Sequence, residues 1–319
     1  MEVTQFTAQA RAEFAKGKLA ADERPFPAEH EMFTSRMGST VKVETHTYMS
    51  NLPRLAEFKD YTPFTRLTNK EYTVSNKEYR TGIAVRKTDV DDDQTSGYMN
   101  SVNGLPARAQ KDVGHMTLDH LADGTTNLCF DGTAFFAASH TVGSGDNLDT
   151  FDGASNDGVT HKIIALVCDN PHVKPILFQD REPLSELQTD AGTPQAALVK
   201  DYQYWVDCRF GLGYGYWWDA YHLTITDTPT IEEIYTIFEQ IVNGFRTFTL
   251  PKGKDTDDSL YIHEGWKPSK ENFVLLCNLK LGARLERAMS LTQYVASTGN
   301  VDNVYKDKAT VIPTSALGA

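Results

Sequence analysis

The sequence predicts an α+β protein that carries one long two-stranded ribbon. Two observations indicate this class. Segments with strand-like and helix-like patterns are mixed along the chain, but they do not alternate as the elements of a βαβ series do. In addition, residues 62–90 alternate apolar and polar side chains, and each arm of about 13 residues would span about 40 Å. A compact chain of this length has a radius of gyration of about 20 Å, so such a ribbon can project past its own domain.

The composition is that of an ordinary folded protein, with 40% hydrophobic and 23% charged residues. The apolar runs are only as long as strands, so no transmembrane span is expected, and the N-terminus lacks the pattern of a secretory signal. The net charge of −12 argues against a protein that binds free nucleic acid through a basic face. It is compatible with a container for DNA, because a lining should not hold phosphate tightly.

The cysteines provide no sign of a metal or redox motif. Cys129, Cys168, Cys208 and Cys277 lie far apart, and no CxxC pair occurs. We expect buried, reduced thiols, as in a protein made in the cytosol.

The first 60 residues read as an arm with a helix at its start. Phe6, Ala10 and Phe14 recur at the spacing of one helical face. The rest of residues 1–60 shows little periodicity, and so long a stretch without a pattern is uncommon inside a compact domain. We expect this segment either to wrap over another part of the structure or to lie on a neighbouring molecule.

Ser75 and Asn76 are the expected turn between the two arms of the ribbon in residues 62–90. Tyr72 and Val74 mark one apolar face, and the many charged residues suit a ribbon that is wetted on the other. The alternative is a two-stranded piece of an ordinary internal sheet.

An acidic run follows the ribbon, with Asp89, Asp91, Asp92 and Asp93. We interpret it as a solvated turn, or as negative charge that favours the start of the next helix. A cation site is the alternative, because clustered carboxylates suit hard cations, but the spacing matches no EF-hand loop.

Residues 98–123 predict a long helix. Its apolar stripe consists of Leu105, Ala109, Val113, Met116 and Leu121. Pro106 should either begin the regular part of the helix or kink it, and Gly124 is a natural end.

The remaining segments predict strands and two shorter helices. The strand-like segments read HKIIALVCDN, VKPILFQDRE and YQYWVDCRFGLGYGYWWDAYHLTIT. A helix is expected over residues 229–245, with Asp227 or Thr228 as the N-cap and Pro229 in the first turn. The sequence NFVLLCNLKLGARLERAM predicts a buried strand that leads into a short helix, and ATVIPTSAL predicts a last strand.

No catalytic residue, cofactor site or metal ligand is predicted. The HExxH, GxSxG and Walker motifs are absent. Gly211, Gly213 and Gly215 lie in an aromatic strand and open no helix, so we expect β-bulges or close backbone approach there rather than a dinucleotide loop. Cys129 and His140 would act as a nucleophile and a base only with a third group that the sequence does not indicate.

A small-molecule enzyme is nevertheless one hypothesis for the function of this chain. Its pocket would lie among Trp205, Trp217, Trp218 and His222, and it predicts a compact monomer or small oligomer. A shell or compartment protein that holds a cargo is another hypothesis.

Six segments, in this order, resemble the Mu-like phage major head subunit family. They are YTVSNKEYRTGIAVRKTDVDDD, the helix from Tyr98 to Gly124, CFDGTAFFAASH, KPILFQDREP, GLGYGYWWDAY and NVYKDKATVIPTSAL. An aromatic-DG-x-x-FF-x-x-x-H pattern falls on Phe130, Asp131, Gly132, Phe135, Phe136 and His140. The resemblance covers about residues 35–319 and departs from the family at Pro106 and over residues 252–270.

The resemblance implies a Hong Kong 97 type capsid fold. Its parts would be an N-terminal arm (1–60), an extended loop (61–95), a peripheral domain (96–228) with the spine helix 98–123, and an axial domain (229–319). The candidate assembly residues on the extended loop and spine are Phe64, Arg66, Lys70, Tyr72, Asn76, Glu78, Tyr79, Arg80, Arg86, Asp91 and Asp92.

The implied partner is the chain itself, assembled into the hexamers and pentamers of an icosahedral virion head. The head would enclose double-stranded DNA without sequence-specific binding, would involve no membrane, and would assemble in the host cytoplasm. A portal, a scaffold, a maturation protease and decoration proteins are further implied partners. The hypothesis expects the ribbon near Asn76 and the leading segment to find their buried environment on other copies.

Overall fold

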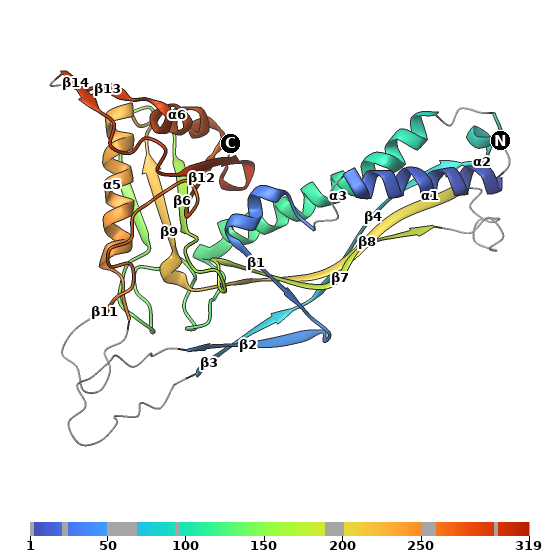
Figure 1. The fold of residues 1–319 in the computed structure, drawn as a ribbon, viewed down its shortest axis with the longest axis horizontal. Helices are drawn as coiled ribbons and strands as arrows, with labels where there is room; N and C mark the ends of the chain where they lie inside the picture. The colour runs from blue at the N-terminus through green and yellow to red at the C-terminus, as the bar shows by residue number, and fades with distance from the viewer. Residues whose placement is uncertain are drawn as a thin grey trace.

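The molecule is elongated, with a lobe at one end and a long arm of strands and helices at the other (Figure 1). This computed structural model describes residues 3–20, 25–49, 69–92, 96–188, 201–250, 260–296 and 299–318. The accessible surface is 17172 Å², whereas a compact monomer of 35.6 kDa exposes about 13,000 Å².

The lobe is built on a five-stranded sheet in the order β15-β12-β6-β9-β5. Its strands are β5 (Leu148–Asp152), β6 (His161–Val167), β9 (Ala220–Thr226), β12 (Phe273–Asn278) and β15 (Thr310–Thr314). The helices α5 (Ile231–Thr247) and α6 (Leu279–Ser290) pack on this sheet (Figure 1). Every residue of β12 is buried, so the predicted buried strand and short helix are confirmed. The sheet takes β5, β6 and β9 from before residue 229, so the lobe is more than the C-terminal segment.

The N-cap of α5 is Thr230, not Asp227 or Thr228 as expected. The Thr230 side chain accepts a hydrogen bond from the Glu233 backbone N–H, and the Glu233 carboxylate accepts one from the Thr230 backbone N–H. The prediction missed this capping box because Pro229 was assigned to the first turn. Pro229 instead precedes the cap.

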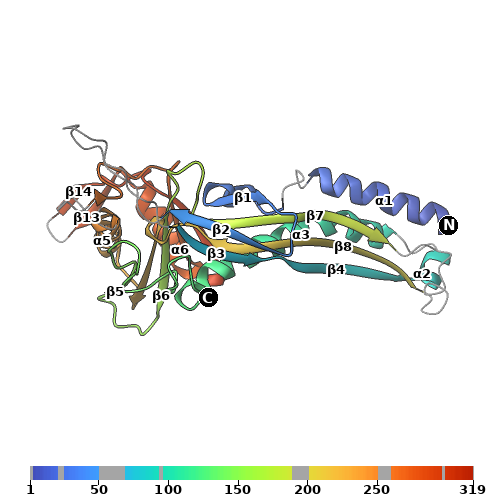
Figure 2. The same cartoon turned by 90° about the horizontal axis from the view of Figure 1, so that it is seen from below.

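The arm is built on a four-stranded sheet in the order β1-β7-β8-β4. Its strands are β1 (Thr34–Gly38), β4 (Lys77–Arg86), β7 (Ile176–Gln188) and β8 (Asp201–Tyr214). β7, β8 and β4 run side by side along the arm (Figure 2). The long helix α3 (Ser96–Ala122) contacts this sheet, and the predicted stripe is buried at Leu105, Ala109, Val113 and Leu121. Pro106 lies inside α3 and does not begin it.

The leading helix α1 (Val3–Ala20) packs on α3 of its own chain. Ala10 and Phe14 are buried in a cluster that they share with Val102 of α3 and Val85 of β4. The side chain of Phe6 lies outside the described residues. The apolar face of the leading segment is therefore covered within the subunit, which corrects the expectation that another copy covers it.

The predicted pairing of the ribbon is wrong. β3 (Asn69–Ser75) pairs antiparallel with β2 (Val43–Met49), and β4 pairs with β8, so the strands on either side of Asn76 do not pair with each other. A period of two identifies a strand but not its partner, and an asparagine after a serine does not reverse the chain here. The two-stranded ribbon of this protein is β2–β3, a sheet of its own beside the arm (Figure 1).

The aromatic run also divides in two. β8 ends at Tyr214, a 3-10 turn spans Trp217–Asp219, and β9 begins at Ala220 in the other sheet. The same run thus joins the arm to the lobe. The other elements are α2 (Lys87–Asp91), the pairs β10 (Thr249–Leu250) with β11 (Leu260–Tyr261) and β13 (Gln293–Ala296) with β14 (Gly299–Asp302), and the 3-10 turns Ala28–Met32, Asp123–Thr125 and Ser315–Leu317.

All four thiols are free. Cys129 and Cys277 are buried, and Cys168 and Cys208 are half-buried. Burial raises the pKa of Cys168 and Cys277 to about 12 and that of Cys208 to about 11. These thiols are therefore protonated and unreactive at neutral pH.

Candidate assembly interface

The β2–β3 ribbon lies close against β8 because β8 has glycines where the ribbon crosses it. A Cβ at Gly213 would stand 2.7 Å from Val74 Cγ2, and a Cβ at Gly211 would stand 2.8 Å from Val74 Cγ1. Val74 is buried at this crossing, with 3% of its surface exposed. The expectation of close backbone approach at these glycines is confirmed.

Asn76 holds the point where the chain leaves the ribbon and enters the four-stranded sheet. Its side-chain amide donates to Ser39 Oγ at 2.9 Å and to the carbonyl of Val41 at 2.7 Å. Its side-chain oxygen Oδ1 accepts from Gln179 Nε2 at 2.8 Å, and its backbone N–H donates to Lys42 O at 2.9 Å. Asn76 is thus satisfied within its own subunit, which corrects the expectation that this residue needs another copy.

Two tyrosines anchor the ribbon in the core of the lobe. The Tyr48 hydroxyl donates to the carbonyl of Tyr214 at 2.8 Å, and its ring stacks on Phe130 with centroids 4.8 Å apart. Tyr72 meets Tyr48 edge-on at 6.2 Å, and burial raises the pKa of Tyr72 to about 12. The base of the ribbon therefore has a fixed position on the subunit.

The outer face of β4 and β8 carries a network of paired charges. Arg209 contacts Glu78 at 3.0 Å and Glu182 at 3.1 Å, and Arg80 contacts Asp207 at 3.2 Å. The arginine side chains are 39% to 52% exposed, and such pairs contribute little individually because water screens them. The network leaves a face of mixed charge on the arm.

The other predicted residues have separate surroundings. Tyr79 stacks on Phe210 with centroids 4.4 Å apart. Lys70, Arg86 and Asp92 are exposed. Phe64, Arg66 and the side chain of Asp91 lie outside the described residues. The structure thus brings Asn76, Glu78, Tyr79 and Arg80 together along one edge of the arm, and it separates them from Asp92 by the length of β4.

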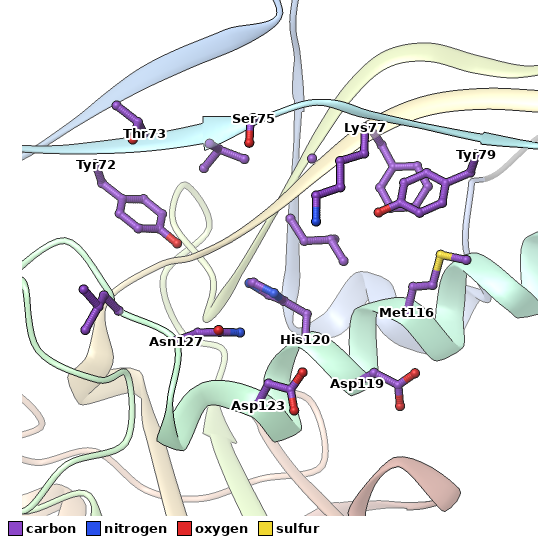
Figure 3. A pocket seen from close by; sticks show the side chains of 15 residues that line it. Tyr72, Thr73, Ser75, Lys77, Tyr79, Met116, Asp119, His120, Asp123 and Asn127 are labelled. Carbon is purple, nitrogen blue, oxygen red and sulfur yellow. The ribbon is translucent and has the colours of Figure 1, made fainter.

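The sequence did not predict a cleft of about 600 Å³ between β3 and the end of α3 (Figure 3). Lys77 reaches into it from β4, and Asp119, His120 and Asp123 line it from the helix side. Burial, with Lys77 as a smaller cause, lowers the pKa of His120 to about 4, so this ring is neutral at pH 7. Leu128 lines the cleft and is 59% exposed. The cleft can receive a polar side chain, and no sequence motif marks it because its residues come from distant segments.

The structure separates the residues of the expected aromatic pocket. Trp205 lies in the four-stranded sheet, 5.9 Å from the guanidinium of Arg80. Trp217 and Trp218 are buried in the core of the lobe, and His222 lies there against Phe136. The predicted pocket among the three tryptophans is therefore wrong.

Cys129 and His140 do meet, around Asp131. The Cys129 thiol donates to Asp131 Oδ1 at 3.0 Å, and His140 Nδ1 lies 2.9 Å from Asp131 Oδ2. Burial raises the pKa of the Cys129 thiol well above its usual range, so it is not an activated nucleophile. The sequence did not identify Asp131 as the group between them.

The fold is of the Hong Kong 97 type, the class of fold that phage capsid proteins have. Over 92% of this chain and 91% of the other, the structure is similar to the capsid of bacteriophage JBD30, with a TM-score of 0.69 and 17% identity. It is also similar to the procapsid protein of that phage, with a TM-score of 0.68 and 20% identity over 99% and 100% of the two chains. The α+β capsid fold is confirmed.

Residues 3–241 match the family model described as Mu-like prophage major head subunit gpT. The chain belongs to this family, which confirms the resemblance. It is 26% identical to the Mu-like prophage FluMu major head subunit of Haemophilus influenzae over 67% of this chain and 71% of that one. It is 22% identical to the major capsid protein of Escherichia phage Mu over 60% of this chain and 65% of that one.

The chain is thus a structural subunit of a virion head, which forms a shell by self-assembly, and it is not an enzyme. In another solved structure similar to this chain, the JBD30 capsid is decorated with minor capsid protein trimers. None of the helices in the described ranges is both long and apolar enough to cross a membrane.

Proposed function

We propose that the chain assembles into pentamers and hexamers that close into an icosahedral head around packaged double-stranded DNA. The observation that carries this proposal is the ribbon β2–β3, which forms a sheet of its own beside an elongated arm (Figure 1). Each subunit can then form several modest contacts, which act together in a closed shell.

The extended-loop role belongs to β2–β3 in this proposal, rather than to residues 61–95. The ribbon engages a neighbouring subunit through residues 50–68, which join its strands, and the exposed Glu78 and Arg80 on β4 contribute to contacts along the arm. The lobe around the five-stranded sheet serves as the axial domain, and the four-stranded sheet with α3 as the peripheral domain. Support comes from the fixed base of the ribbon at Tyr48 and Asn76, which orients it before assembly.

The partners follow from this role. The net charge of −12 suits a lining that releases DNA, so contact with the genome carries no sequence specificity. A portal, a scaffold, a maturation protease and decoration proteins would act on the same shell, which would assemble in the host cytoplasm.

A variant in which a short turn replaces the segment between β2 and β3 tests the proposal. A deletion of residues 68–80 would also disturb the folded subunit, because it removes the buried Val74 and the hydrogen-bonded Asn76. Met49 pairs with Asn69, so an Asn-Gly turn in place of residues 50–68 can join β2 to β3 as a tight hairpin.

We expect this variant to keep the circular dichroism spectrum and thermal midpoint of the parent but to remain as monomers or small oligomers by light scattering. The parent, produced in the same way, should give closed particles in electron micrographs. Closed shells of normal size from this variant would show that assembly does not need residues 50–68 and would overturn the proposed contact of this segment with a neighbouring subunit.

A further inference from the structure

A compact group of three potential metal ligands lies beside the base of the ribbon, on the turn that carries Phe130. It consists of Cys129 Sγ, a carboxylate oxygen of Asp131 and a ring nitrogen of His140, all within 4.8 Å of one another. The side chains of His140 and Asp131 are fully buried, and Cys129 is 3% exposed. Zn²⁺ binds such atoms at about 2.0–2.3 Å, so rotations of these side chains would bring all three atoms around one ion.

The backbone fixes the three groups in place. Cys129, Asp131 and Thr133 alternate on one tight turn, closed by hydrogen bonds from Gly132 N to Cys129 O at 3.1 Å and from Cys129 N to Thr133 O at 2.8 Å. Gly132 has a φ of +82°, which favours glycine. Thr141 is the residue after His140, and its backbone N–H donates to Asp131 Oδ2 at 3.1 Å. This hydrogen bond holds the chain beside His140 against the same carboxylate. The site is therefore formed by folding and needs no rearrangement of the chain.

Asn147 determines which nitrogen of His140 faces the cluster. The Asn147 Nδ2 group donates to three backbone carbonyl oxygens, those of Phe135, Trp217 and Ala220, at 2.9, 3.1 and 3.2 Å. Its Oδ1 therefore faces the other way, where it accepts from Ala137 N at 2.9 Å and lies 3.1 Å from His140 Nε2. Nε2 must carry a proton to meet this acceptor, which leaves Nδ1 as the atom that faces Asp131. Metal-bound histidines are oriented by this kind of hydrogen bond.

We propose that Cys129 Sγ, Asp131 and His140 Nδ1 bind one divalent cation of the Zn²⁺ type. When the cation binds, the proton of the Cys129 thiol and the proton shared between His140 and Asp131 pass to the solvent. The thiolate and the carboxylate then balance the 2+ charge of the ion.

The donor set selects the kind of cation. A thiolate and an imidazole favour Zn²⁺ and Co²⁺ over Mg²⁺ and Ca²⁺, which prefer oxygen ligands. The Thr133 hydroxyl lies 3.0 Å from His140 Nδ1 and 2.5 Å from Asp131 Oδ1, and it is the nearest protein group for a fourth position. The proposal is independent of shell assembly, because all its residues belong to one subunit.

Cobalt binding tests this site on the full chain. We expect protein prepared with a chelator and then dialysed to bind one Co²⁺ per chain, with the near-ultraviolet absorption band of a thiolate–cobalt bond. Zn²⁺ should abolish this band by displacement. Cys129→Ser should lose the band, whereas Cys208→Ser should retain it, because Cys208 lies in the four-stranded sheet. Absence of the band in the parent, or its persistence in Cys129→Ser, would overturn the proposal.

A measurement on the unmodified protein covers the case in which a variant does not fold. X-ray absorption at the zinc edge of the zinc-loaded parent should show one sulfur ligand with nitrogen and oxygen neighbours. A spectrum with no sulfur, or with two or more, would contradict the assignment. Light scattering and microscopy of the same sample report shell assembly separately, so failure of one proposal is distinguishable from failure of the other.

Discussion

The side chain of Val74 occupies the space that a Cβ on Gly213 would need, 2.7 Å from that position. This contact seats the ribbon on β8, so Gly213→Ala should displace it. We expect a loss of about 1–3 kcal/mol in the free energy of unfolding, as for other overpacked sites, together with fewer closed particles. Urea denaturation and particle counts in micrographs check both effects. Gly38→Ala is the matched control, since nothing lies within 4 Å of a Cβ at that strand position; equal effects of the two changes would contradict the role of the contact.

Asn76→Ala should destabilise the subunit more than an asparagine change elsewhere on the surface. It removes the partner at 2.8 Å from the buried amide of Gln179, which keeps only the longer contacts to Ser39 Oγ at 3.4 Å and to Val74 O at 3.5 Å. The expected loss is about 1–3 kcal/mol, because a buried amide that loses its shortest hydrogen bond is no longer compensated for its desolvation. Asn100→Ala, at an exposed position of α3, serves as the control in the same denaturation series. If the two variants unfold at the same urea concentration, the Asn76 network does not hold the ribbon.

Stability should fall as the pH drops from about 6.5 to about 4. Burial, with Lys162 as a smaller cause, lowers the pKa of His222 to about 4 in the folded protein, and burial does the same for His30. The unfolded chain binds these protons at about pH 6.5, so acid favours unfolding within this window, by up to about 3 kcal/mol per group.

The variant His222→Phe tests this dependence, since it removes a proton acceptor from a site against Phe136. The urea midpoint of this variant should change less between pH 7.5 and pH 4.5 than that of the parent. The exposed His172 provides the control, and His172→Phe should leave the dependence unchanged. An unchanged slope in His222→Phe would show that other groups cause the acid sensitivity.

Thr230→Ala should lower the free energy of unfolding by about 1 kcal/mol, because it removes the side-chain half of the capping box of α5. Thr236→Ala, made on the exposed face of the same helix, should have little effect or stabilise slightly, since alanine favours helix interiors. Differential scanning calorimetry compares the two. A smaller loss for Thr230→Ala than for Thr236→Ala would exclude the cap as a source of stability.

Local patterns predicted most elements of the fold, and distant pairings account for the errors. The stripe at Leu105, Ala109 and Val113 predicts α3 because helical spacing is encoded within one segment. The partner of β3 is not encoded in this way, because β2 precedes it by some twenty residues. No short turn motif links the two strands in the sequence, so their pairing cannot be predicted locally. The aromatic run was read as one strand because no local signal reveals that it passes from one sheet to another at Trp217.

The same limit applies to the sites. Asn76 was named as an interface residue from its place in a turn-like dipeptide, yet Ser39, Val41 and Gln179 satisfy it through contacts that cross the chain. The cleft beside His120 joins residues from three separate regions and has no linear signature. The cluster at Asp131 was partly visible, since Cys129 and His140 were noticed, but the role of Asp131 depends on a turn that only the folded chain displays.

The anchoring of the ribbon has a mechanical consequence. The Tyr48 hydroxyl donates to the backbone carbonyl of Tyr214, and the Tyr214 hydroxyl in turn donates to the backbone carbonyl of His120 in the last turn of α3. Tension applied to β2 by an adjoining molecule is therefore transmitted through two hydrogen bonds to the end of a helix of 27 residues. Under mechanical load on an assembled shell, the strain therefore need not concentrate at the ribbon, because the helix α3 of each subunit bears part of it.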